Sequence, residues 1–290
     1  MSMRTSLRQY LKQMIYVVVF RNTVCTGDLI ILGLALAVFT VAVPLYTVTS
    51  IFSTQPVVDA LKYILVDVMT PMLVMVYSWY IAETYVTTTG EVNDLRALLL
   101  SLPYTRRFIG VTTYLDVLIT YTIAYVCAVV TPFWLVLGNY MVMVLNYIAI
   151  KYTVIIVEAL LYTSLSLIIM MLLSEQRESL RKYTALGVCL LHYVVSRYVW
   201  ALYTTALPEV DLKLTISTSA LPIDEALAYY VLCNVLGLKF SGVRCRGLAC
   251  ISIPMSTAAS NLFIIVPMIL LTLLVLSALY LVARRLEVVK

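Results

Sequence analysis

The chain of 290 residues is too apolar for a soluble protein of its length. Hydrophobic residues make up 62% of the chain and charged residues only 12%, whereas a typical globular protein is about 45–50% apolar and about 25% charged. So few charged side chains cannot cover the surface of a soluble domain. The composition therefore predicts an integral membrane protein, and the net charge of +5 is no sign of nucleic-acid binding, because basic residues in such proteins mark topology.

Residues 1–22 are predicted to form an amphipathic interfacial helix, separate from a transmembrane domain over residues 23–290. Apolar side chains fall on one helical arc (Leu7, Leu11, Met14, Ile15, Val18), and Thr5, Arg8, Gln9, Lys12 and Gln13 fall on the other. A basic helix of this kind lies at the boundary between lipid headgroups and acyl chains. The apolar stretch 14–20 also fits a short seventh span, and that alternative stays open.

Six apolar runs are long enough to cross a bilayer as helices. A spanning helix needs about 20 mostly apolar residues, and such runs occupy residues 29–51, 61–82, 111–137, 148–173, 184–207 and 262–282. The predicted fold is therefore an all-α polytopic membrane protein with about six transmembrane helices.

Basic residues are concentrated on one side of these spans. Most of the 20 Lys and Arg residues lie in the N-terminal segment, in the loops after the second and fourth spans, and in the C-terminal tail. Because basic loops remain in the cytoplasm, both termini are expected to be cytoplasmic in a multi-pass protein of the cell membrane. Arg21 counts among the cations of the N-terminal segment, and Asp116 is expected to meet water near the cytoplasmic face.

The cytoplasmic loop 83–110 contains a second amphipathic segment. Gly90 interrupts the preceding helix, and a helical pattern then runs to Pro103, where a helix would end. Its members are Glu91, Leu95, Leu98, Leu99 and Leu102. An apolar helix face in the cytoplasm needs a surface to pack against, and the pattern alone favours a protein partner and the membrane equally.

Three ionisable residues fall in the outer half of the predicted spans: Asp67, Glu158 and Arg197. Inserting such a residue costs about 2.5–3.5 kcal/mol, so each needs a partner or contact with water. Arg197 is able to neutralise either acid. The three residues fit a structural ion pair or a polar translocation path, and both readings remain open.

The predicted extracytoplasmic loop 208–261 contains Cys245 and Cys250 in the sequence CRGLAC. On the oxidising side of a membrane these two thiols can form a disulfide, and two free thiols is the alternative. No metal site is expected, because the chain has a single histidine and no C-x-x-C pair.

Catalytic signatures are missing from the sequence. It contains no H-E-x-x-H, no G-x-S-x-G and no G-x-x-x-x-G-K-[ST]. The chain is therefore not expected to be an enzyme, and it has no P-loop with which to bind ATP.

Loop 83–110 resembles the corresponding loop of the ABC type 2 permease family. Members of that family carry an acidic residue, a helix start after glycine, a leucine-rich helix and a Leu-Pro-x-[Ser/Thr]-Arg turn. These places are filled here by Glu83, Gly90, residues 95–100 and Leu102-Pro103-Tyr104-Thr105-Arg106, and the tail sequence 283–287 is also typical. The chain departs from the family in having Glu91 after the glycine and no lysine at the start of the third span.

The resemblance implies that this chain is the permease subunit of an ATP-driven exporter. The cytoplasmic segment would then be a coupling helix that docks on a separate ATP-binding subunit, where ATP and Mg²⁺ bind, while this chain holds no cofactor. The implied contact residues are Glu91, Leu95, Leu98, Leu99, Leu102, Pro103 and Arg106. A second permease copy or a paralogue would complete the transporter within membrane lipid. The alternative function is that of a membrane assembly or anchoring protein without an ATPase partner, and the sequence does not discriminate among cargoes.

Overall fold

The structure is a computed structural model. It describes residues 11–19, 21, 26–37, 69–86, 106–138, 141–206, 241–246, 249–254 and 257–285.

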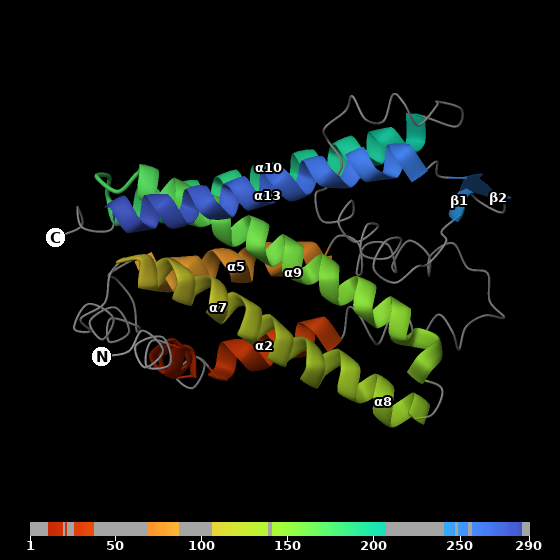
Figure 1. The fold of residues 1–290 in the computed structure, drawn as a ribbon, viewed down its shortest axis with the longest axis horizontal. Coiled ribbons are helices and arrows are strands. Elements are labelled where there is room, and N and C mark those ends of the chain that lie inside the picture. Colours follow the sequence, from red (N-terminus) through yellow and green to blue (C-terminus); the bar gives the residue numbers. More distant parts are fainter. Residues whose placement is uncertain are drawn as a thin grey trace.

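The described residues form long helices and one two-stranded hairpin. The elements are α2 (Thr26–Ala37), α5 (Thr70–Val86), α7 (Arg106–Tyr125), η3 (Val126–Val130), α8 (Thr131–Leu137), α9 (Met141–Leu172), α10 (Glu178–Ala206), β1 (Ser241–Arg246), β2 (Ala249–Pro254) and α13 (Thr257–Arg285). In Figure 1 the chain runs back and forth along the long axis, with α2, α7 and α10 in one direction and α5, α9 and α13 in the other. The predicted helical class is confirmed, and the hairpin is a small addition to it.

Three of the helical stretches are long and apolar enough to cross a membrane: Phe108–Leu135, Tyr152–Leu172 and Met268–Arg285. They correspond to the third, fourth and sixth predicted spans, whereas α2, α5 and α10 lie within or overlap the other three. Both α7 and α9 begin earlier than the predicted spans. The extra residues of α7 begin with Arg106 and Arg107, whereas residues 141–147 at the start of α9 are mostly apolar and were left out of the predicted span. Residues 38–68 lie outside the described part of the chain.

The bundle has an apolar outer surface and a partly polar interior. Large apolar side chains such as Leu191, Leu273 and Leu276 are more than half exposed, whereas Thr112 and Ser164 are fully buried. Such a distribution suits helices that face lipid, because lipid solvates apolar side chains and polar groups then bond between helices.

Helix α9 is the centre of the bundle, since it packs against α5, α7, α10 and α13. A glycine lies where α7 packs against α13. A Cβ atom at Gly110 would lie 2.9 Å from Leu279 Cδ2 and 3.5 Å from Val282 Cγ1, so the absence of a side chain at Gly110 allows the two helices to pack closely.

Helix α7 continues into the π-helical turn η3, which is wider than an α-helical turn and ends just before Pro132. Proline has no N–H group, and its ring collides with the carbonyl four residues earlier, here that of Ala128. A wider turn relieves this conflict, and Val126 O accepts hydrogen bonds from the Thr131 N–H and, at 2.9 Å, from the Thr131 hydroxyl. The helix therefore continues through Pro132 to Leu137, where Gly138 follows with a positive φ of 51°.

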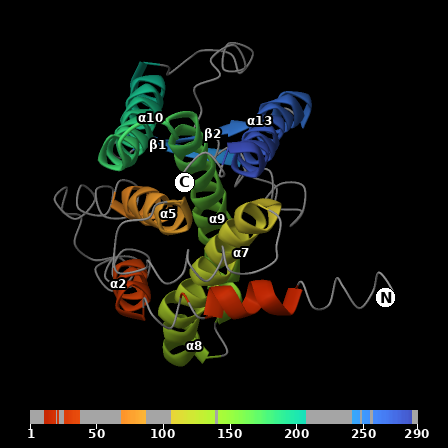
Figure 2. The ribbon, with the colours of Figure 1, turned by 90° about the vertical axis from the view of Figure 1, so that its left-hand side faces the viewer.

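The helical residues 11–19 lie across one end of the bundle, whereas the long helices run along it (Figure 2). Met14, Val17 and Val18 are buried, while Leu11 and Ile15 are about half exposed. The apolar residues of this helix are thus divided between a side that packs on the protein and a side that does not. Residues 1–10 lie outside the described part of the chain.

Candidate functional site

The segment expected to couple to a partner joins α5 to α7. Six of its predicted contact residues lie outside the described part of the chain: Glu91, Leu95, Leu98, Leu99, Leu102 and Pro103. The seventh, Arg106, is the first residue of α7. The end of α5 and the start of α7 lie at the same end of the bundle as residues 11–19, the α9–α10 turn and the end of α13 (Figure 1).

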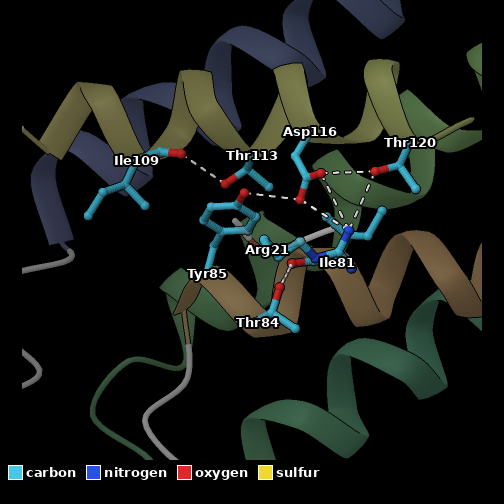
Figure 3. A network of polar contacts seen from close by, with 8 residues as sticks. All are labelled: Arg21, Ile81, Thr84, Tyr85, Ile109, Thr113, Asp116 and Thr120. Atoms are coloured by element: carbon cyan, nitrogen blue, oxygen red, sulfur yellow. Dashed lines mark hydrogen bonds and ion pairs between the residues drawn. The ribbon is translucent and has the colours of Figure 1, made fainter. Parts of the chain in front are cut away.

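A buried ion pair joins the N-terminal region to α7 near this end. Arg21 Nη1 lies 3.2 Å from Asp116 Oδ2 and 3.4 Å from Asp116 Oδ1, and both side chains have an exposed fraction of 0%. Figure 3 shows the Arg21 side chain directed at the Asp116 carboxylate in the space between α5 and α7. The residues are separated by 95 positions in the chain, so this contact depends entirely on the fold.

Two hydroxyl groups complete the hydrogen bonding of the Asp116 carboxylate. The Tyr85 hydroxyl in the last turn of α5 donates to Oδ2 at 3.0 Å, and the Thr120 hydroxyl one turn further along α7 donates to Oδ1 at 2.9 Å. The Arg21 guanidinium also lies over the Tyr77 ring, with Cζ 5.9 Å from the ring centroid. The ion pair therefore joins three segments: the N-terminal region, α5 and α7.

The positions of Arg21 and Asp116 correct two expectations. Arg21 was expected in the cytoplasmic N-terminal segment, at the membrane surface, and Asp116 in contact with water, but both are fully buried. Each charge is tolerated at this depth because the other neutralises it, and removing one partner of such a pair typically costs about 3–5 kcal/mol. The unusual feature of the sequence was an aspartate within an apolar run, and it indicated that a partner was needed without indicating which.

A second polar contact joins α5 to α10 at the same end. Lys182 Nζ forms an ion pair with Glu83 in the last turn of α5, and lies 3.6 Å from Glu178 Oε1, one turn earlier on α10. The Trp79 indole N–H donates to the Lys182 carbonyl at 3.2 Å. Glu83 is also the acidic residue in the resemblance to the permease family, and the structure gives it a contact with another helix.

A third contact joins α13 to α9. Arg285 Nη1 donates to the carbonyls of Met171 and Leu172, at 3.4 and 3.2 Å. The last carbonyls of a helix have no partner within the helix, and a cation there also complements the helix dipole. The end of the bundle next to the 87–105 segment thus carries three polar connections between helices.

Further along the bundle, hydroxyl groups connect helices in pairs. The Tyr121 hydroxyl of α7 donates to Val74 O of α5 at 2.9 Å and therefore accepts from Ser78 at 3.0 Å. Tyr114 and Ser164 link α7 to α9 through a 2.7 Å contact between their hydroxyls. Such bonds between membrane helices contribute about 0.6–2 kcal/mol each, so these hydroxyls fix helix positions.

Of the three ionisable residues of the predicted polar path, the structure describes the side chain of Glu158 alone. Glu158 is buried in the middle of α9. Arg197 lies on α10, but its side chain is outside the described part, and Asp67 is outside it altogether. The choice between an ion pair and a translocation path remains a prediction. His192, on the same helix as Arg197, meets the Tyr162 ring edge-on, with centroids 5.8 Å apart.

The two cysteines of the predicted extracytoplasmic loop lie on neighbouring strands. β1 pairs with β2 antiparallel, and Cys245 stands directly opposite Cys250. Directly opposed residues of an antiparallel pair have Cα atoms about 4.5–5.5 Å apart, within the range that a disulfide spans. The register therefore suits the predicted bond, which stays a prediction.

The described residues include no group of three or more His, Cys, Asp and Glu side chains placed to hold a metal ion. Comparisons of the chain with protein-family models, with curated proteins and with solved structures found no match.

Proposed function

We propose that this chain is the membrane-spanning permease subunit of an ATP-driven exporter, with six spans and both termini in the cytoplasm. The observation that carries the proposal is the position of the polar contacts. Tyr85–Asp116 and Glu83–Lys182 both involve the last turn of α5, which leads directly into the leucine-rich 87–105 segment. A partner bound to that segment would act on α5 and α7, and through them on α10 and the N-terminal helix.

The mechanism needs two conformations of the bundle with different affinities for the partner. A ligand shifts a conformational equilibrium only as far as it binds one state better than the other. In the proposed transporter, ATP and Mg²⁺ bind in the partner subunit, and its closure displaces residues 91–106. Because Glu83 and Tyr85 are one turn or less from the end of α5, a displacement there alters their contacts with Lys182 and Asp116. A second permease copy, or a paralogue, forms the other wall of the transport path.

Aspartate substitutions on the leucine face test the proposal. The tagged chain is purified in mild detergent from its native membranes, as wild type and as Leu98→Asp/Leu99→Asp, and the co-purifying proteins are identified by mass spectrometry. We expect a stoichiometric P-loop ATPase with the wild type. Because losing one central interface side chain costs about 2 kcal/mol or more, roughly 30-fold in affinity, the double variant should lose it.

A matched control is available within the same segment. Leu100 falls on the opposite side of the predicted helix from Leu95, Leu98, Leu99 and Leu102, so Leu100→Asp makes the same chemical change away from the docking face. It should retain the ATPase. If the wild-type chain is recovered without any ATPase, the proposal fails and the role of a membrane assembly or anchoring protein is favoured. Loss of the ATPase from both variants alike would contradict the docking face.

A further inference from the structure

Arg181, in the first turn of α10, is a buried cation. Its exposed fraction is 3%, and its Nε and Nη1 atoms have no hydrogen-bond partner within the part of the chain that the structure describes. A buried guanidinium usually has its N–H groups bonded, because leaving a charged donor unpaired costs more than about 1–3 kcal/mol. Arg181 is therefore a buried cation whose counter-ion is not among the described residues.

The neighbouring cations already have partners or face outward. Lys182 pairs with Glu83 and Glu178, and Arg285 bonds to the carbonyls at the end of α9. Arg177, before the first turn of α10, is exposed. Arg181 is thus the buried cation of this turn that an incoming anion would meet.

The start of α10 adds backbone donors to the same place. The backbone N–H of Arg181 donates to Arg177 O at 3.1 Å, which is the first backbone hydrogen bond of helix α10. The backbone N–H groups of residues 178–180 come before this bond in the chain. N–H groups at a helix N-terminus lack partners within the helix and attract anions, phosphate groups in particular. Helical side chains tilt toward the N-terminus in general, so the position of Arg181 in the first turn suits an anion bound at these groups.

The surface next to Arg181 includes large exposed apolar side chains among polar ones. Leu180 and Tyr183 on α10 are 51% and 70% exposed, and Leu172 at the end of α9 is 53% exposed. A buried cation beside exposed apolar side chains, at the end of a bundle of apolar helices, matches the two parts of a phospholipid. Basic pockets between membrane helices bind anionic headgroups in this way. A free phosphate ion would use the cation but not the apolar side chains.

We propose that Arg181 and the N-terminus of α10 bind the phosphate group of an anionic phospholipid. The bound headgroup neutralises the buried guanidinium, and an acyl chain lies along Leu180 and Tyr183. This site is independent of the ATPase partner, so the inference holds or fails separately from the proposed function.

Thermal unfolding of the purified full chain in neutral detergent tests the site. Wild type, Arg181→Gln and the control Arg177→Gln are each heated alone, with phosphatidylglycerol, with phosphatidylcholine and with inorganic phosphate. Phosphatidylglycerol should raise Tm by about 2–4 °C or more in wild type and Arg177→Gln. It should leave Arg181→Gln unchanged, and phosphatidylcholine should not distinguish the three proteins. Without lipid, Arg181→Gln should unfold at the wild-type temperature or above it, because the substitution removes an unpaired buried charge.

Three results would overturn the proposal. One is an equal response of Arg181→Gln and wild type to phosphatidylglycerol, and another is no response in either. The third is an Arg181-dependent rise with inorganic phosphate as large as that with the lipid, which would assign the site to a soluble anion. If Arg181→Gln does not fold, Arg181→Lys replaces it. Lysine keeps the charge without the planar fork, so its rise with phosphatidylglycerol should be smaller than that of wild type, and native mass spectrometry should detect less retained phosphatidylglycerol on it.

Discussion

The Arg21–Asp116 ion pair makes the strongest prediction about stability. In Arg21→Met the Asp116 carboxylate stays buried and keeps the Tyr85 and Thr120 hydroxyls as donors but loses the charge that neutralises it. In Asp116→Asn the buried guanidinium loses its counter-ion. Each single change should cost about 3–5 kcal/mol. At about 2 °C per kcal/mol for a chain of this length, Tm should fall by about 6–10 °C.

The double variant Arg21→Met/Asp116→Asn should be more stable than either single variant. It removes both charges together, and replacing a whole buried ion pair is often close to neutral. The asparagine also keeps a carbonyl oxygen that can accept from Tyr85 and Thr120. The expected coupling between the two sites is therefore large, and it is measured as the difference between the double variant and the sum of the two single variants.

The buried thiol of Cys189 offers a direct assay of unfolding. Cys127 is exposed and Cys189 is fully buried. Accessible thiols are blocked in the native state, the protein is heated, and labelling of Cys189 is followed by mass spectrometry. The matched control is Lys12→Met, an exposed cation on the same N-terminal helix, which should change stability by no more than about 0.5 kcal/mol. The reasoning is refuted if Arg21→Met unfolds at the same temperature as the control Lys12→Met. It is also refuted if the double variant unfolds at a temperature no higher than that of the single variants.

Two further predictions concern packing and redox state. Gly110→Val should destabilise the chain by about 1–3 kcal/mol, because its side chain would push Leu279 and Val282 away; in the same labelling assay Gly187→Val should have no such effect, since a Cβ there meets nothing within 4 Å. In protein purified without reductant, Cys245 and Cys250 should resist alkylation until a reductant is added, and Cys245→Ser should leave Cys250 reactive at once. Alkylation of both thiols before reduction would show that the bond is not formed.

The class of the protein follows from the sequence because hydropathy is a local property. A run of about 20 apolar residues favours lipid whatever the rest of the chain does. The runs 111–137, 148–173 and 262–282 correspond to long apolar helices in the structure. The helix starts were placed less well: α7 begins with two arginines before its apolar part, and α9 includes the mostly apolar residues 141–147, which the predicted span left out. The amphipathic pattern of loop 83–110 also depends only on residues that are close in the sequence. It therefore indicated an apolar helix face but not the surface that covers this face.

The pairing of charges was decided by the tertiary structure alone. Arg21 was assigned to the cytoplasmic N-terminal segment and Asp116 to the water interface, because a sequence does not show which helices are neighbours. Their contact requires α5, α7 and the N-terminal helix to meet at one depth with particular rotations about their axes. The same reason explains Arg181, which resembles any other loop cation in the sequence. Only the packing of the helices buries it without a counter-ion among the described residues, which is the observation behind the proposed lipid site.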